Sequence, residues 1–185
     1  MPFWNELTVS PVRDDNGRIT HYISIFKDVT ERKRQEAALL KSANFDALTE
    51  LPNRTLLLDR LDLAISSGTR HNRKIGLLFI NLDKFKVIND SLGHDAGNTL
   101  IQQMAQRLHA CLWDGDTLAR IGGDEFVFLL DEIGDEKNIL GITQRIFESL
   151  TKPLELAGQE VVISASIGAS VFPRDGETAA LLLQR

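Results

Sequence analysis

The stretch RIGGDEFVFLL, residues 120–130, determines more of the predicted fold than any other part of the chain. Gly122 and Gly123 lie between β-branched and aromatic residues, which predicts a tight hairpin turn. Glycine adopts a positive φ at little cost and lets another group approach the backbone closely. Asp124 and Glu125 come next, followed by an apolar run typical of a buried strand. The two carboxylates are therefore predicted at a rigid strand end.

Two neighbouring carboxylates at such a place repel each other unless a cation lies between them. Mg²⁺ together with a phosphate substrate is the usual cation in proteins. The alternative is an acidic hairpin tip in water. The four residues alone do not decide between a metal site and a solvated turn.

Composition limits the class of protein. The chain has 185 residues, 43% of them hydrophobic and 25% charged, which predicts a soluble globular protein of one domain and an appendage. The net charge of −5 without a basic block argues against a nucleic-acid-binding surface. The single Cys111 excludes a disulfide framework within the chain. No apolar run approaches the roughly 20 residues that span a bilayer. The chain is therefore predicted to be cytoplasmic, which leaves room for a membrane anchor outside it.

The N-terminal segment predicts a β-hairpin. Leu7–Val12 and Ile19–Phe26 have strand character, and Asp14–Gly17 supplies the turn. A lone hairpin is marginal in water, so this one is predicted to belong to a larger sheet. The segments WNEL (4–7), PVRD (11–14), GRI (17–19) and DVTERK (28–33) resemble the last two strands and the exit of a PAS sensor domain. Residues 1–28 are assigned to that domain.

Residues 29–48 are predicted to form a linker helix, because Asp28 and Thr30 are good capping residues and helix-forming residues follow. Its apolar seam is broken, so pairing of two such helices and a solvated helix both remain open. Residues 49–185 are assigned to the main domain. Within it, Asn53 is predicted to begin a helix that ends at Ser66–Gly68.

A second polar strand end lies upstream of the glycines. The continuous apolar run Ile75–Ile80 predicts a central strand buried on both faces, and it ends in Asn81 and Asp83. A short helix with lysines follows, whose backbone N–H groups and Lys86 can hold phosphates. Asp83 can also be read as the N-cap of that helix. Further predicted elements are a loop at 91–98, helices at 99–112 and 138–150, a hairpin of strands 153–160 and 161–169, and a helix from Thr178 to Arg185.

This order of elements predicts an α+β sandwich: a ferredoxin-like, palm-type, antiparallel-rich sheet with helices packed on it, truncated at the C-terminus. In such a sheet the central strand lies beside the glycine hairpin. Asn81, Asp83, Asp124 and Glu125 would then meet, as in sites for two-metal phosphoryl or nucleotidyl transfer.

Four spaced segments carry a closer resemblance: DALTELPNR (46–54), DKFKVINDSLGHDAG (83–97), GGDEF (122–126) and SIG (166–168). Together they resemble the GGDEF family of diguanylate cyclases over roughly residues 44 to 185. The resemblance implies a bacterial signalling enzyme that condenses two GTP into cyclic di-GMP, with each domain of a homodimer presenting one GTP. The linker helix would then join the two copies.

The same resemblance implies roles for individual residues. Asp124 becomes a metal ligand and base, with Glu125 beside it as a second catalytic acid. The metal, Mg²⁺ or Mn²⁺, is held by Asp124, the Leu82 carbonyl, Asn81 and Asp83. Lys86 joins the catalytic residues by holding phosphates. The remaining substrate contacts are assigned to Lys84, Phe85, Asn89, Asn98, Gly122 and Gly123.

Three residues depart from the family pattern. Asn81 replaces a metal-binding Asp, which removes a ligand charge. Asn98 replaces a guanine-reading Asp and offers one acceptor oxygen fewer. Trp113 stands where the product-inhibition motif has Arg, although Asp116 of that motif is present. The alternative function is therefore a degenerate GTP-binding domain that regulates a phosphodiesterase domain, such as an EAL domain, C-terminal to this chain.

Overall fold

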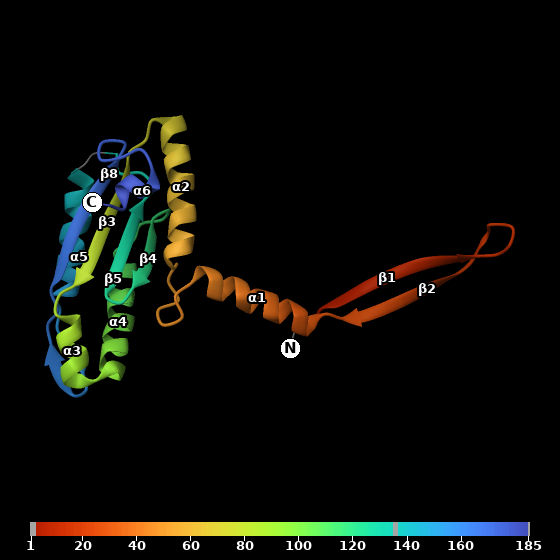
Figure 1. The fold of residues 1–185 in the computed structure, drawn as a ribbon, viewed down its shortest axis with the longest axis horizontal. Coiled ribbons are helices and arrows are strands. Elements are labelled where there is room, and N and C mark those ends of the chain that lie inside the picture. Colours follow the sequence, from red (N-terminus) through yellow and green to blue (C-terminus); the bar gives the residue numbers. More distant parts are fainter. Residues whose placement is uncertain (1–2, 135–136, 185) are drawn as a thin grey trace. The chain divides into compact units, whose positions relative to one another are not determined.

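The computed structural model describes residues 3–134 and 137–184. By its internal contacts the chain divides into two units, Met1–Ala43 and Asn44–Arg185. No helix in the described part of the chain is long and apolar enough to cross a membrane. Figure 1 shows the elements of both units in chain order.

The first unit contains the predicted hairpin and most of the linker helix. Strands β1 (Asn5–Arg13) and β2 (Ile19–Asp28) pair antiparallel, and nearly all their side chains are exposed. Helix α1 spans Thr30–Asn44 and buries no side chain. The prediction that this helix reaches Leu48 is wrong. It ends at Asn44 because Phe45 bridges Pro52, and because the Asp46 carboxylate accepts hydrogen bonds from the Thr49 N–H and hydroxyl.

The second unit opens with helix α2 (Arg54–His71), capped as predicted by the Asn53 side chain, which accepts from the Leu56 N–H. The predicted end at Gly68 is wrong, since the helix continues to His71. Gly68 is there for packing, because a Cβ at this position would lie 2.9 Å from Ile75 Cδ1. Asn72 follows as the C-cap residue, and its φ of 52° is left-handed.

A four-stranded sheet forms the centre of this unit. Its strands, in the order β4-β5-β3-β8, are Thr117–Gly122, Glu125–Leu130, Ile75–Leu82 and Ala165–Phe172. All neighbouring pairs are antiparallel, and this order matches the ferredoxin-like βαββαβ arrangement. The fold class predicted from the sequence is confirmed. A small hairpin, β6 (Leu154–Leu156) and β7 (Gln159–Val161), precedes β8.

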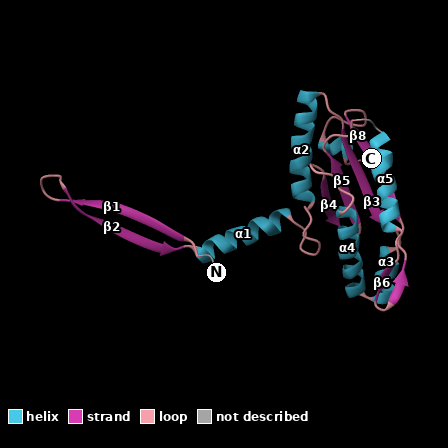
Figure 2. Ribbon diagram, turned by 180° about the vertical axis from the view of Figure 1, so that it is seen from behind, coloured by secondary structure: helices cyan, strands magenta, loops and turns pink. Residues whose placement is uncertain are grey.

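Two hydrophobic clusters cover the two faces of the sheet. One face packs against α4 (His94–His109) and α5 (Lys137–Leu150), with Leu78 and Ile80 of β3 fully or nearly fully buried between them. The other face packs against α2 and the short α6 (Ala179–Leu182). Figure 2 shows α2 and α5 on opposite sides of the sheet. The prediction that β3 is buried on both faces is therefore confirmed.

Other predicted boundaries in this unit are also wrong. Helix α4 begins at His94 instead of Thr99, with its Gly97 inside the helix. The predicted strand 161–169 is split, because the chain leaves β7 at Val161 and joins the sheet at Ala165, then pairs with β3 up to Phe172. Helix α6 covers only Ala179–Leu182; Arg185, the last residue of the predicted helix, lies outside the described residues.

Candidate functional site at the end of strand β3

The two acidic strand ends lie side by side. In the sheet register Asn81 of β3 faces Glu125 of β5 on one side and Ser166 of β8 on the other. Directly opposed residues in antiparallel strands project to the same face, so these three side chains form a polar row. Beside them, the Leu82 N–H donates to the Asp124 carbonyl at 3.2 Å. The predicted meeting of the central strand with the glycine hairpin is therefore present in the structure.

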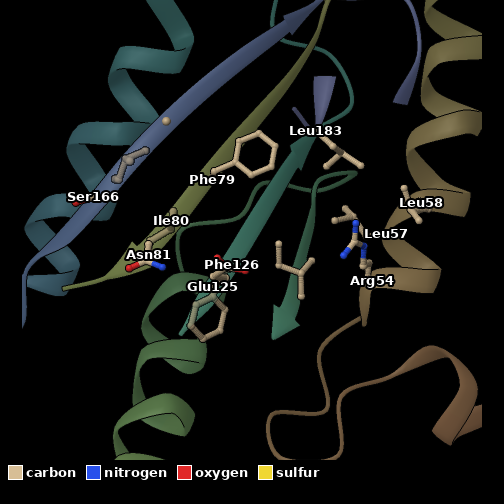
Figure 3. Close-up of a pocket in the computed structure, with 13 residues that line it drawn as sticks. Arg54, Leu57, Leu58, Phe79, Ile80, Asn81, Glu125, Phe126, Ser166 and Leu183 are labelled. Carbon is tan, nitrogen blue, oxygen red and sulfur yellow. The ribbon is translucent and has the colours of Figure 1, made fainter. Parts of the chain in front are cut away.

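A cleft of about 520 Å³ opens on this face of the sheet. Figure 3 shows Asn81, Glu125 and Ser166 along the sheet, with Arg54 of α2 on the far side and Phe79 and Leu183 between them. The cleft is thus polar at the strand ends and apolar toward α6. A site of this kind suits a ligand with a charged part and a flat or apolar part.

Asp83 does not cap helix α3 (Phe85–Leu92), so that interpretation is wrong. Its carboxylate instead accepts hydrogen bonds from the Ser164 hydroxyl at 2.6 Å and the Ser166 hydroxyl at 2.8 Å. These two hydroxyls, Ser164 foremost, hold the pKa of Asp83 below its ordinary value. Its role as a metal ligand stays a prediction.

The turn from β3 into α3 carries the predicted phosphate contacts. Lys84 occupies the N-cap position with φ 61° and ψ 17°, and no side chain caps the helix there. Lys84 and Lys86 are exposed, and Phe85 is half-buried. The first N–H groups of any helix lack partners inside it, so this turn presents backbone donors beside two lysines.

Asn89 lies in α3, and its side chain packs against Gly97 of α4. Its Oδ1 atom is buried and is the one such side-chain atom without a hydrogen-bond partner in the described part of the chain. Gly97 of α4 makes room for it, because a Cβ there would lie 1.8 Å from Asn89 Oδ1. Asn98, the next residue along α4, is exposed. An unpaired buried acceptor is costly, and an N–H donor from a ligand that reached this atom would remove that cost.

The glycine hairpin is open to solvent. Gly123 has φ 49°, and a Cβ built on either Gly122 or Gly123 would meet no atom within 4 Å. No packing within the described structure requires these glycines. Glycine at position 123 suits the left-handed backbone conformation there. Both glycines also leave room for a ligand to approach the backbone closely.

Sequence reasoning missed Arg120, which braces this hairpin. Its Nε and one terminal nitrogen donate to the Gly123 carbonyl, at 3.1 and 2.7 Å. Its other terminal nitrogen lies 2.9 and 3.0 Å from the two carboxylate oxygens of Asp46. Arg120 therefore links the turn to the segment that precedes α2. Only its place two residues before the glycines could have pointed to it.

Asp46 is charged in this network. Burial raises the pKa of its carboxyl, but the Thr49 hydroxyl and the Arg120 guanidinium outweigh burial, and the net pKa lies below the ordinary value. The side chains of Arg120 and Asp46 are 12% and 23% exposed, so water screens their ion pair only partly.

The pKa of Asp116 is shifted in the opposite direction to that of Asp46. Burial raises the pKa of its carboxyl above the ordinary value, in spite of backbone hydrogen bonds at Trp113 and Asp131. Trp113, which replaces the Arg of the product-inhibition motif, is half-exposed, and the Arg145 guanidinium lies 5.0 Å from the centre of its ring.

The donor set at the strand ends fits a hard divalent cation. No three His, Cys, Asp or Glu residues gather as a metal-binding group within residues 3–134 and 137–184. The oxygens available are the carboxylates of Asp124 and Glu125, the Asn81 amide and the Leu82 carbonyl. Such all-oxygen ligands suit Mg²⁺ or Mn²⁺, and the missing carboxylate at Asn81 predicts weaker binding than a full acidic set gives.

Comparison with known proteins agrees with this geometry. The family model described as "Diguanylate cyclase, GGDEF domain" matches residues 43–185, and a PAS domain model matches residues 1–31. The bifunctional diguanylate cyclase/cyclic di-GMP phosphodiesterase MucR of Pseudomonas aeruginosa is 40% identical over 149 residues, covering 80% of this chain and 22% of MucR. The cyclic di-GMP phosphodiesterase NbdA of the same species is 34% identical over 182 residues, covering 98% of this chain and 22% of NbdA.

A solved structure is similar in fold as well. The isolated GGDEF domain of TpbB from Pseudomonas aeruginosa superposes with a TM-score of 0.73 at 39% sequence identity. The match covers 76% of this chain and 82% of that one. The chain therefore corresponds to most of a GGDEF domain, but it spans only 22% of the length of MucR and of NbdA.

Proposed function

Because the chain belongs to the GGDEF family of diguanylate cyclases, we propose that its second unit binds GTP at the end of β3 and that the protein carrying it makes cyclic di-GMP. The family condenses two GTP and releases two pyrophosphates. The observation that carries the proposal is the register of β3 with β5, which sets Asn81 opposite Glu125 and Leu82 beside Asp124. Since GTP is a cytoplasmic nucleotide, the reaction is assigned to the cytoplasm.

GGDEF cyclases generally depend on a divalent metal. In this protein Mg²⁺ or Mn²⁺ would be held by Asp124, the Leu82 carbonyl and Asn81. When bound, the cation neutralises phosphate charge and makes the attacking 3′-hydroxyl more acidic. Asp124 then accepts the proton of that hydroxyl, and Glu125 keeps the strand end negative so that the cation stays in place.

The residues of α3 and α4 would bind the rest of the nucleotide. Lys86, Lys84 and the N–H groups at the start of α3 hold the phosphates, with Phe85 packed under the turn. The buried Asn89 Oδ1 accepts an N–H of guanine, and Asn98 provides a second, weaker contact to the base. The open Gly122–Gly123 turn lets the nucleotide approach the backbone.

Formation of a cyclic dinucleotide needs two GTP molecules facing each other. We assign one GTP to each copy of the domain in a homodimer. Helix α1 exposes Leu39 and Leu40, which makes pairing of two linker helices the route to that dimer. The division into a PAS end at 1–28, a linker at 29–48 and a catalytic domain at 49–185 belongs to this proposal.

The alternative, a degenerate GTP-binding domain that regulates an EAL-type phosphodiesterase, is not favoured by the comparisons. The matching family model is a diguanylate cyclase, and MucR and TpbB carry that activity in their names. Asn81 and Asn98 are the residues that favour it, and NbdA is named as a phosphodiesterase.

The experiment is incubation of the full-length protein with GTP and either Mg²⁺ or Mn²⁺, with mass spectrometry of the nucleotides. We expect cyclic di-GMP and pyrophosphate. The rate should be higher in Mn²⁺, because Mn²⁺ tolerates less regular coordination than Mg²⁺ and so binds better at a site that lacks a carboxylate at Asn81. An Asp124→Asn variant serves as the inactive control. GTP binding without any cyclic di-GMP would favour the regulatory alternative, and no GTP binding would reject both functions.

A further inference from the structure

We propose that Asp83, Ser164 and Ser166 form a positioning clamp that holds the phosphate-binding turn of residues 84–86 in place. The inference rests on the proposed GTP site and deepens it. It gives Asp83 a role in shaping the turn instead of in binding the metal. It also brings in Ser164, which no sequence motif had singled out, and gives a role to Ser166 of the SIG segment.

The clamp concentrates three hydrogen bonds on one residue. The Asp83 N–H donates to the Ser164 carbonyl at 2.9 Å, and its two carboxylate oxygens each accept one serine hydroxyl, at 2.6 and 2.8 Å. Hydrogen bonds to a charged acceptor are short and about twice as strong as neutral ones. Asp83 is therefore fixed in both its backbone and its side chain.

The clamp lies at the point where β3 leaves the sheet and the chain turns into α3. The ladder between β3 and β8 ends at the pair Leu82 and Ala165. Asp83 lies one residue beyond that end, and its partners flank Ala165 on both sides. The clamp thus extends the attachment of β3 to β8 by one residue, up to the point where the chain turns into α3.

The residue after the clamp needs such support. Lys84 adopts the left-handed conformation, with φ 61°, which is strained for a residue with a Cβ. No side chain caps α3 at this position. Hydrogen bonds from the Val87 and Ile88 N–H groups to the Lys84 carbonyl fix the turn on the helix side, at 2.9 and 3.3 Å. The Asp83 clamp fixes it on the strand side, so Lys86 and the first N–H groups of α3 keep one orientation.

The serine variants separate positioning from metal binding. In the full-length protein, a Ser164→Ala/Ser166→Ala double variant removes both hydroxyls and leaves the Asp83 charge intact. The matched control is Ser164→Thr/Ser166→Thr, which keeps both hydroxyls on residues that β-strands accept. Asp83→Asn is the third variant, because it removes the charge but retains an acceptor for one hydroxyl.

The measurement is the affinity of each variant for Mn²⁺ alone, for guanosine, and for a GTP analogue whose α–β phosphate bond cannot be cleaved. We expect the double alanine variant to bind the GTP analogue about tenfold more weakly, because binding must then fix the orientation of a turn that is no longer held in place. Guanosine and Mn²⁺ affinities should not change, and the double threonine variant should bind as the wild type does. Unchanged affinity for the GTP analogue in the double alanine variant would overturn the clamp. Loss of Mn²⁺ binding in Asp83→Asn alone would show a metal ligand instead.

A second readout needs no nucleotide. Amide hydrogen exchange at Asp83, Val87 and Ile88, whose N–H groups are bonded in this turn, should be faster in the double alanine variant than in the threonine control, because the turn opens more often. Equal exchange in both variants contradicts the clamp. If the wild type binds no GTP, the proposed function fails, and this exchange measurement still decides whether the clamp exists.

Discussion

Asn81 is the single residue with the largest expected effect on metal binding. Asn81→Asp restores a ligand charge at the strand end, and it also sets a second carboxylate opposite Glu125. Like charges directly opposite each other in a sheet are destabilising. We expect tighter Mg²⁺ binding by calorimetry and a lower Tm in metal-free buffer that recovers when Mg²⁺ is added.

Asn98→Asp is the matched control for this charge change, because Asn98 lies on α4, away from the strand ends. It should leave affinity for Mg²⁺ alone unchanged. Equal or weaker Mg²⁺ binding in Asn81→Asp would contradict the placement of the metal at Asn81.

Asp46 predicts an acid-sensitive stability. The pKa of its carboxyl is lower in the folded protein than in the unfolded chain. Its contribution is therefore fully present above the ordinary carboxyl pKa and is lost as the pH falls through the folded value. Asp46→Asn should destabilise the protein at pH 7 by about 1–3 kcal/mol, since Arg120 loses its charged partner. Denaturant unfolding measures the drop in the free energy of unfolding between pH 7 and about pH 3. That drop should be smaller in the variant than in the wild type. Parallel losses in wild type and variant would reject this account of Asp46.

Asp116 predicts the opposite pH dependence. Burial raises the pKa of its carboxyl in the folded protein, so its contribution is favourable at low pH and is lost as the pH rises through the folded value. Asp116→Asn keeps an acceptor for the backbone N–H groups and removes the charge. We expect the Tm at pH 7 to rise by up to about 3 °C, a small effect because water still screens a group that is only half-buried. The gain should vanish at about pH 3, and a lower Tm at pH 7 would be the contrary result.

At the level of elements, helix α6 contributes more than its length suggests. Leu182 is fully buried, and its carbonyl accepts a hydrogen bond from the buried Ser170 hydroxyl. Leu182→Ala should cost about 2–4 kcal/mol in the free energy of unfolding. Leu181→Ala in the same helix is the matched control, because Leu181 is 50% exposed, and it should cost less than about 1 kcal/mol. Similar costs for the two variants would mean that α6 does not pack on the sheet.

Elements with strong local signals could be predicted from the sequence. The glycine pair marked the β4–β5 turn, and the apolar run 75–80 marked a strand covered on both faces. The wrong predictions concern residue types that have both a local and a packing role, such as Gly at helix ends and Asp at helix caps. Gly68 and Gly97 look like helix breaks, yet both lie inside helices because a neighbouring side chain needs the space. Asp83 looks like an N-cap, yet serines 81 and 83 residues away in sequence hold it.

In the candidate site, too, some residues could be predicted from local motifs and others only from the fold. Asp124, Glu125, Asn81 and Asn89 lie within recognisable motifs, so the sequence could place them at strand and helix ends. The pair Arg120–Asp46 joins residues 74 apart, and no local pattern encodes it. The unpaired Oδ1 of Asn89 likewise depends on the packing of α3 against α4, which only the fold shows.

At the scale of the whole molecule, the two units contribute different things. The second unit contains the hydrophobic clusters, the cleft and every proposed nucleotide contact. The first unit consists of an exposed hairpin and a helix without buried side chains, and the hairpin matches a PAS domain model. The proposed nucleotide contacts therefore require only the second unit, and none of them lies in the first.

The most direct test of the central claim is the preference of the full-length protein for GTP over ATP. Calorimetric titration with the non-cleavable analogues in the presence of Mn²⁺ measures it, in wild type and in Asn89→Ala. The account predicts at least about tenfold tighter binding of the GTP analogue, because the adenine ring offers no N–H donor where guanine does. It also predicts loss of that preference in Asn89→Ala with the phosphate contacts retained. Equal affinity for the two analogues in the wild type would contradict a guanine site at Asn89, and with it the assignment of the β3 edge as a GTP site.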